Sequence, residues 1–234
     1  MAAVPAVAAE VRRERDNISR DVRASIPFLV TLLAACSGPA PVPARPPAPP
    51  APAAPGQLLP PAAFATITEP AARSRAMFTE ASRVLTHARC VNCHPPDDTP
   101  RQGDDHALHD PPAPRGPAGH GVPAMQCGTC HQDGNRPDAR VPGAPNWHLA
   151  PIEMVWLGRS PAQICAQISD PKRNGQKTIA QIQDHLAHDP LVGWSWKPGH
   201  GRTAPPGSQA ELGALFQGWI DSGAVCPPDE ENRP

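Results

Sequence analysis

The chain has 234 residues and a net charge of −1, so no excess of basic residues argues for a nucleic-acid partner. It contains 35 prolines and 18 glycines, but only 4 phenylalanines, 5 tryptophans and no tyrosine, which excludes a core built mainly from aromatic side chains. Such a chain is either disordered, or a domain whose apolar filling is partly not protein.

The first 36 residues resemble a bacterial export signal. Five arginines among residues 10–23 precede an apolar run from Ile26 to Ala35, which is shorter than the roughly 20 residues that span a bilayer and typical of the apolar part of a signal peptide. The run ends in Leu-Ala-Ala-Cys36, similar to a lipobox. We expect residues 1–36 to direct export and Cys36 to be lipidated, which gives a stable membrane anchor. The alternative is a short buried helix with a free cysteine.

A proline- and alanine-rich segment follows. Residues 39–61 contain 11 prolines in 23 positions, a composition that favours a semi-rigid polyproline spacer. We expect residues 37–63 to form a stalk, residues 64–228 to form the folded domain and residues 229–234 to be a tail. The alternative for the stalk is a disordered, proline-rich ligand for a partner.

Four helices are predicted in the folded domain, each from a local start signal. The stretch Thr68-Glu69-Pro70 opens the first helix with a cap and an early proline. Ser160 and Thr178 each stand three residues before a glutamine, as in a capping box, and Ser208 begins the last helix. Residues 95–150 show almost no periodicity. The sequence therefore predicts a mainly α fold with extensive irregular loops, which wrap around something large, and few or no strands.

The pattern Cys-x-x-Cys-His occurs twice, as Cys90-Val-Asn-Cys93-His94 and as Cys127-Gly-Thr-Cys130-His131. This is the attachment signature of c-type haem. Two cysteines on one turn can form thioethers to the vinyl groups of one haem, and the adjacent histidine lies beneath the iron as its axial ligand. The motifs predict two covalently attached haem c groups.

Other cofactors and bonds would also use paired cysteines. The four motif cysteines could bind one zinc ion as thiolates, but this leaves both trailing histidines unexplained. Two short-loop disulfides and a thioredoxin-like redox motif are further alternatives, and the second needs a βαβ context that the sequence lacks.

Two cysteines remain after the motifs and Cys36 are assigned. Cys165 and Cys226 can pair as a disulfide in an oxidising compartment, which would tie the helix near residues 160–168 to the C-terminal segment. Two free buried cysteines are the alternative.

The sixth iron ligand of each site is sought among the other histidines. Histidine in that position gives a lower reduction potential than methionine, and eight histidines outside the motifs favour histidine for at least one iron. The preferred candidates are His109, His148, His188 and His185. Methionines 77, 125 and 154 are the less favoured choice.

From Cys90 to Cys226 the chain resembles a family of small exported dihaem cytochromes, often labelled "isoquinoline 1-oxidoreductase subunit". The stretches that carry the resemblance are CVNCHP, QGDDHALHD, CGTCH, PGAPNWHLAPIEMVW, ICAQISDPKRNG, HLAHDPLVGWSWKPG and WIDSGAVCP. The resemblance implies a periplasmic redox partner of the molybdenum-containing hydroxylase class, from which the cytochrome would accept electrons.

We expect an electron-transfer protein that has no catalytic residues of its own and passes electrons to the respiratory chain. An enzyme alternative is a dihaem peroxidase, which needs one five-coordinate iron. A third alternative is a haem-based sensor of a small gas.

Overall fold

The computed structural model describes residues 50–229. The expected export signal, the lipidation candidate Cys36 and residues 37–49 of the expected stalk lie outside these residues. Within the described part, no helix is both long and apolar enough to cross a membrane.

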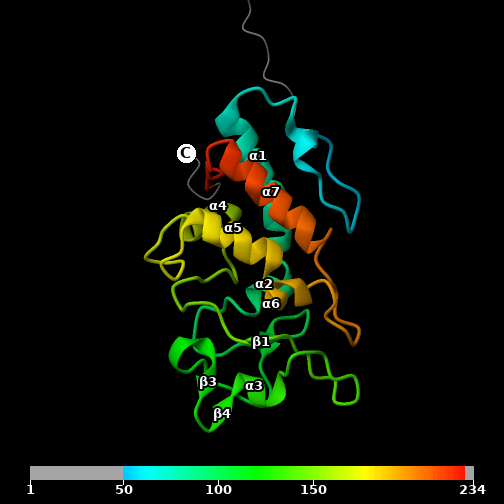
Figure 1. Ribbon diagram of the computed structural model, residues 1–234, viewed down its shortest axis with the longest axis vertical. Coiled ribbons are helices and arrows are strands. Elements are labelled where there is room, and N and C mark those ends of the chain that lie inside the picture. Colours follow the sequence, from blue (N-terminus) through cyan, green and yellow to red (C-terminus); the bar gives the residue numbers. More distant parts are fainter. Residues whose placement is uncertain (1–49, 230–234) are drawn as a thin grey trace, which may run out of the picture. The chain divides into compact units, whose positions relative to one another are not determined.

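The described residues are mainly helical and have few strands, as the sequence predicts (Figure 1). The longer helices are α1 (Pro70–Leu85), α4 (Pro161–Ile168), α5 (Ile179–His188) and α7 (Gln209–Asp221). The shorter elements are the 3-10 helices η1 (Pro61–Phe64) and η2 (Pro117–Gly119), the helices α2 (Ala88–Val91), α3 (Cys127–Cys130) and α6 (Pro190–Trp194), and the strands β1 (Arg101–Gln102), β2 (Ala107–Leu108), β3 (Gly121–Val122) and β4 (Met125–Gln126).

The four predicted helices begin where the sequence places them. Ser160 and Thr178 form complete capping boxes at the starts of α4 and α5, and the Ser208 side chain accepts from the Glu211 backbone N–H at the start of α7. At the start of α1 the capping side chain is Glu69, which accepts from two backbone N–H groups of the first turn. These side chains bind backbone donors that have no partner within the helix.

The hydrophobic core lies between α1, α4, α5 and α7. Phe78 of α1 packs against Phe216 and Trp219 of α7, with ring centres 5.8 and 5.2 Å apart, and all three rings are fully buried. Aromatic pairs at such distances add to the stability that burial provides. We call these four helices, with the segments packed on them, the helical region.

The folded part begins before residue 64, the start expected from composition. Leu58 belongs to the same core as Phe64, and the backbone N–H of Leu59 donates to a Glu80 carboxylate oxygen at 3.0 Å. The Gly56 carbonyl also accepts from the backbone N–H of Gly207. The end of the proline-rich segment thus packs on the domain, because its last apolar residues have a core to enter.

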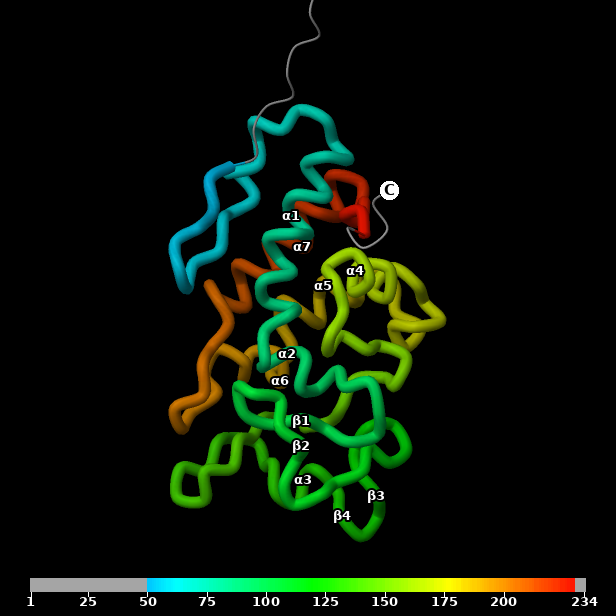
Figure 2. The backbone as a smooth tube through the Cα atoms, turned by 180° about the vertical axis from the view of Figure 1, so that it is seen from behind, coloured from blue at the N-terminus to red at the C-terminus, as the bar shows by residue number. Residues whose placement is uncertain are grey.

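Residues 92–153, which we call the loop region, lie on one side of the helical region in both views of the backbone (Figures 1 and 2). They contain two antiparallel hairpins, in which Gln102 pairs with Ala107 and Val122 pairs with Met125. Among the described residues, none from 92 to 149 belongs to the hydrophobic core cluster. The loop region therefore has little apolar packing of its own.

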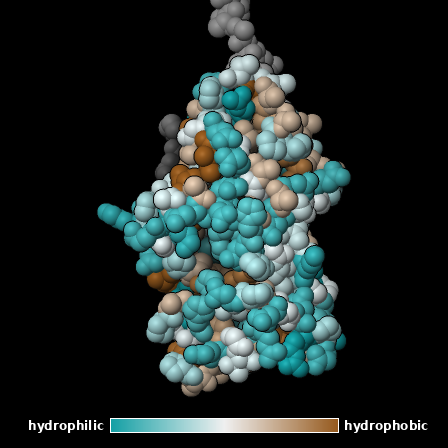
Figure 3. Space-filling model, in the orientation of Figure 1, coloured by the Kyte–Doolittle hydropathy of each residue, from teal (hydrophilic) through white to brown (hydrophobic). Residues whose placement is uncertain are grey.

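The short helix α6 links the two regions. The Trp194 indole N–H donates to the Asn135 side-chain oxygen at 2.8 Å, and the Asn135 amide donates to the Lys197 carbonyl at 2.8 Å. On the face shown in Figure 3 the surface is mainly hydrophilic, with apolar residues in small groups, some of them where the two regions meet.

Candidate functional site

The first Cys-x-x-Cys-His motif lies where α2 leads into the loop region. Cys90 is on the last turn of α2, and the His94 N–H donates to the Val91 carbonyl, which keeps the motif in a tight turn. Backbone N–H groups of Ala150 and Trp156 donate to the carbonyls of Cys93 and His94. Burial raises the pKa of the Cys90 thiol to about 12 and that of Cys93 to about 11.

The second motif forms its own helical turn, α3, within the loop region. The His131 N–H donates to the Cys127 carbonyl at 2.9 Å. Cys127 is half-buried and Cys130 is exposed, and α3 has no buried residue. Burial also raises the pKa of Cys127. Both motifs therefore lie on short helical turns. Cys90 and Cys93 are half-buried like Cys127, whereas Cys130 is exposed.

His94 is held by a backbone carbonyl and an indole. Its ring Nδ1 lies 3.0 Å from the Met154 carbonyl oxygen, and the Trp156 ring stacks on it with centres 3.5 Å apart and planes 5° from parallel. A carbonyl partner requires a proton on Nδ1, which leaves Nε2 with its lone pair. Burial lowers the pKa of His94 to about 3 and so keeps the ring neutral.

His131 is held in the same way by different residues. Its Nδ1 lies 2.8 Å from the Pro142 carbonyl oxygen, and the Trp147 ring stacks on it at 4.4 Å with planes 4° apart. Gly143, next to Pro142, lies so close to the carbonyls of Gln132 and Gly134 that a Cβ atom could not fit. A glycine at position 143 allows this close approach of the backbone, and the adjacent Pro142 carbonyl contacts the His131 ring. Within residues 50–229, the Nε2 atoms of His94 and His131 make no hydrogen bond.

A cavity of about 770 Å³ reaches both motifs. Cys93 lines it from the first motif, and Cys127, Cys130 and His131 line it from the second. Its volume falls within the range of roughly 300–1,000 Å³ that is usual for small-molecule and cofactor sites. Burial raises the pKa of Cys93, Arg89 lowers it, and a charge on Cys127 raises it further, so the thiols of the two motifs lie within electrostatic range of each other.

Two buried arginines beside the first motif were not expected from the sequence. Arg89 directly precedes Cys90, lines the cavity and pairs with Asp104 through Nη2. Arg115 donates through Nη1 to the Ala150 carbonyl and is 6% exposed, while Arg89 is 5% exposed. The Nε atom of each is buried and has no hydrogen-bond acceptor among the described residues. The only sequence signal for either arginine is that Arg89 directly precedes Cys90 of the first motif.

Of the expected sixth ligands, His109 lies nearest to a motif histidine ring. The ring centres of His109 and His131 are 5.8 Å apart, with planes at 66°. The His109 Nδ1 is 2.7 Å from the Pro111 carbonyl oxygen, so its Nε2 is also available as a ligand.

The other three candidates lie in different surroundings. His185 and His148 are both close enough to His94 for their positive charges to lower its pKa, and the His185 Nδ1 lies 3.2 Å from an Asp189 oxygen. His148 packs against His120, with ring centres 5.0 Å apart. His188 has a 71% exposed side chain, and it pairs with Asp184 at 2.8 Å. The structure therefore keeps His148 and His185 near the first motif and places His188 in solvent.

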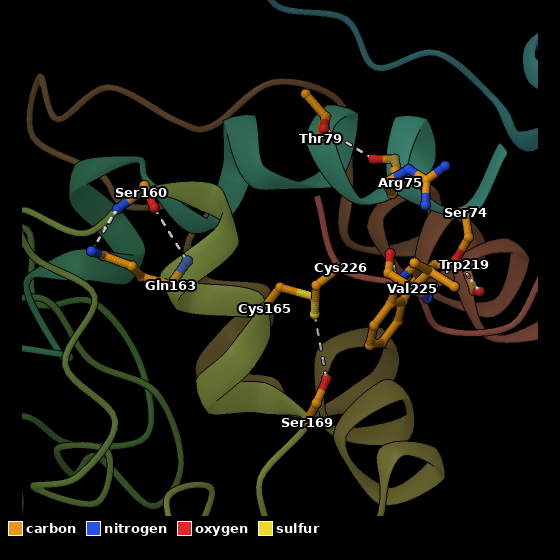
Figure 4. Close-up of a disulfide and its surroundings, with 10 residues drawn as sticks. All are labelled: Ser74, Arg75, Thr79, Ser160, Gln163, Cys165, Ser169, Trp219, Val225 and Cys226. Carbon is orange, nitrogen blue, oxygen red and sulfur yellow. Dashed lines mark hydrogen bonds between the residues drawn. A yellow bond between two sulfur atoms is a disulfide. The ribbon is translucent and has the colours of Figure 1, made fainter. Parts of the chain in front are cut away.

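The remaining cysteines form a disulfide between Cys165 of α4 and Cys226, which follows α7 (Figure 4). The four motif cysteines are free, so the structure does not contain the two short-loop disulfides. In the described part of the chain, no three His, Cys, Asp or Glu side chains converge as metal ligands, which a zinc site of four thiolates would require.

No family model, curated protein or solved structure matches the chain. The assignment of the site therefore depends on its own chemistry. The donor set fits covalently bound haem on three points. Four motif thiols are free, and three of them line one cavity. Two imidazoles are oriented with Nε2 not hydrogen-bonded, and two buried guanidinium groups each have an unused donor. The residues that would hold the two groups are those of the two motifs.

Proposed function

We propose that the protein is a dihaem c-type cytochrome that transfers electrons. The observation that carries this proposal is the repeated arrangement at the two motifs. Each places paired thiols on a turn, followed by an imidazole whose Nδ1 is tied to a carbonyl and whose face is covered by an indole. A bound haem c would supply one-electron chemistry at its iron.

The chain's own residues would hold and orient the two groups. The carbonyls of Met154 and Pro142 fix the tautomer of the motif histidines and make them better ligands, which is a common arrangement around metal-binding histidines. Trp156 and Trp147 stack on one face of each ring and would help to orient it. Thioether bonds through the four motif cysteines would prevent loss of the cofactor, so the protein could exchange electrons repeatedly.

His109 is the proposed sixth ligand of the second site, because its ring lies against His131 and has a free Nε2. The first site would take its sixth ligand from His148 or His185, the two histidines that are in electrostatic range of His94. Coordination by two histidines closes an iron to substrates and favours electron transfer over catalysis.

The proposed setting is the periplasmic face of a bacterial membrane, with anchoring through Cys36. This part of the proposal is supported by the sequence of residues 1–36, and by the disulfide, a bond that persists in oxidising compartments. The electron donor would be a periplasmic dehydrogenase or hydroxylase, with molybdenum-containing hydroxylases among the candidates, and the acceptor would belong to the respiratory chain.

The test is the haem content of the full chain, produced with a c-type maturation system. Pyridine haemochrome and intact mass should show two haems per chain, one for each motif. Replacing Cys127 and Cys130 by alanine should leave one. Replacing Cys165 and Cys226 by alanine removes the same number of cysteines and should leave two. A wild-type chain without covalent haem would disprove the proposal, and tightly bound zinc would favour the alternative.

A second measurement separates electron transfer from peroxidase activity or gas sensing. EPR and optical spectra of the ferric protein should show two low-spin haems that do not change with peroxide or carbon monoxide. His109→Ala should convert one haem to a high-spin form that binds carbon monoxide, while His188→Ala should change nothing. A high-spin haem and peroxide turnover in the wild type would instead establish an enzyme.

A further inference from the structure

The two motifs differ in how far protein encloses them. Around the first motif, Arg89, Val91, Asn92 and Pro95 are buried. Around the second, Gln126, Gly128, Thr129 and Cys130 are exposed. Exposure to solvent is one of the factors that set the potential of a bound redox centre, because water stabilises the more highly charged, oxidised state.

The arginines beside the first motif are also more deeply buried than the arginine beside the second. The Arg89 and Arg115 side chains are 2% and 7% exposed, and both lie beside Cys93. Arg89 lines the same cavity as Cys93. Arg115 donates to the carbonyl of Ala150, and the backbone N–H of Ala150 donates to the Cys93 carbonyl. At the second motif, Arg202 lies within electrostatic range of His131; it is half-buried and donates to the Pro198 and Arg140 carbonyls.

The counter-charges of the buried arginines are exposed to water. Asp104, the partner of Arg89, has a 40% exposed side chain, and Asp98, 3.7 Å from the Arg115 Nε, is 79% exposed. Solvent screens these carboxylates more strongly than it screens the buried guanidinium groups. A net positive potential therefore remains at the first motif.

We propose, on the basis of the function above, that Arg89 and Arg115 make the first motif the higher-potential haem site, and that the exposed second motif is the port at which a one-electron donor reduces the protein. A buried positive charge disfavours the oxidised iron, which carries one more positive charge than the reduced iron. One electron then moves from the second site to the first: the second site is oxidised, the first is reduced, and no proton or group is transferred.

The test is a spectroelectrochemical titration of the full dihaem chain, which should show two one-electron steps. Arg89→Gln should lower the higher potential and leave the lower one in place. The expected shift is a tenfold change in the ratio of reduced to oxidised haem at fixed potential, which is about 59 mV for a one-electron couple. Asp104→Asn, which removes the exposed counter-charge, should shift the same step upward.

Two further variants control and assign the result. Arg75→Gln removes the same charge from α1, where the Arg75 side chain is 39% exposed and pairs with Glu69, and it should move neither step. The variant with Cys127 and Cys130 replaced by alanine should keep one haem, and that haem should titrate at the higher potential.

Three results would overturn the inference: a shift of the lower step in Arg89→Gln, a downward or absent shift in Asp104→Asn, or a single haem that titrates at the lower potential. If Arg89→Gln does not accumulate as folded protein, Asp104→Asn and the variant without Cys127 and Cys130 still test the inference, because both keep the buried guanidinium groups. Failure of the wild-type chain to bind two haems would instead refute the proposed function, and it is measured first.

Discussion

The helical region buries its apolar side chains in a core of protein atoms, whereas most of the loop region lies outside that core. The helical region packs Phe78, Phe216 and Trp219 into a core of protein atoms. The loop region contributes no residue between 92 and 149 to that core, and it lines a cavity of about 770 Å³ instead. Ordering a residue costs roughly 1–2 kcal/mol of conformational free energy, so the loop region needs another source of stability.

The difference shows that the low aromatic content has a different consequence in each region. In the helical region a few large side chains suffice, because α1, α5 and α7 bring them together. In the loop region Trp147 stacks on His131, and Trp156, a core residue that follows this region, stacks on His94. Under the proposed function, the two haems would supply the apolar filling of the loop region.

The largest expected effect is the loss of order in the loop region when no haem is attached. In the variant with all four motif cysteines replaced by alanine, amides of residues 92–153 should open at a free-energy cost near 0, because no core holds them. Amides of α1 and α7 should keep several kcal/mol of protection. Hydrogen exchange read by mass spectrometry measures both. Equal protection of the two regions would show that the loop region is stable without haem, contrary to the difference described above.

A change within the helical core should affect the whole molecule. Trp219 is fully buried against two phenylalanines, so Trp219→Ala should lower the free energy of unfolding by about 3–5 kcal/mol. The same substitution at Trp147 serves as the matched control in the haem-free chain. It should cost less than about 1 kcal/mol, since that ring stacks on His131 outside the core. Urea unfolding followed by circular dichroism compares the two, and equal losses would contradict the division.

The smallest expected effect concerns a helix start. Ser160→Ala removes the acceptor for the Gln163 N–H and half of a capping box, so it should lower the unfolding free energy by about 1 kcal/mol. Ser160→Asp restores an acceptor and should recover most of the loss. Urea unfolding resolves both changes. A neutral Ser160→Ala would mean that α4 is held by its disulfide and packing alone.

Much of the fold follows from local signals. The caps at Glu69, Ser160, Thr178 and Ser208 each act within three residues, so the sequence predicts where the four longer helices begin. The helices α2, α3 and α6 and the four strands are too short to show periodicity. The packing of Leu58 on the core was also missed, because a proline-rich composition does not reveal which apolar residue meets a partner distant in sequence.

The two motifs of the candidate site could be predicted from the sequence, and the residues that surround them could not. The spacing of the motifs identifies Cys90, Cys93, Cys127 and Cys130 and the two following histidines. The carbonyls of Met154 and Pro142 reach their rings from 60 and 11 residues away, and no local pattern encodes such pairing. Arg115 gives no sequence signal at all, since its burial depends on residues 97 and 150.

The placement of the disulfide has a consequence for how the protein is made. The proposed thioether formation would require the motif thiols to be reduced, whereas Cys165 and Cys226 must be oxidised to form their disulfide. Thiol–disulfide exchange needs a thiolate with access to a sulfur atom. Cys165 is fully buried in the helical region, and the raised pKa values of Cys90 and Cys93 keep those thiols protonated. We therefore expect the two sets of cysteines to mature without scrambling, each in its own part of the molecule.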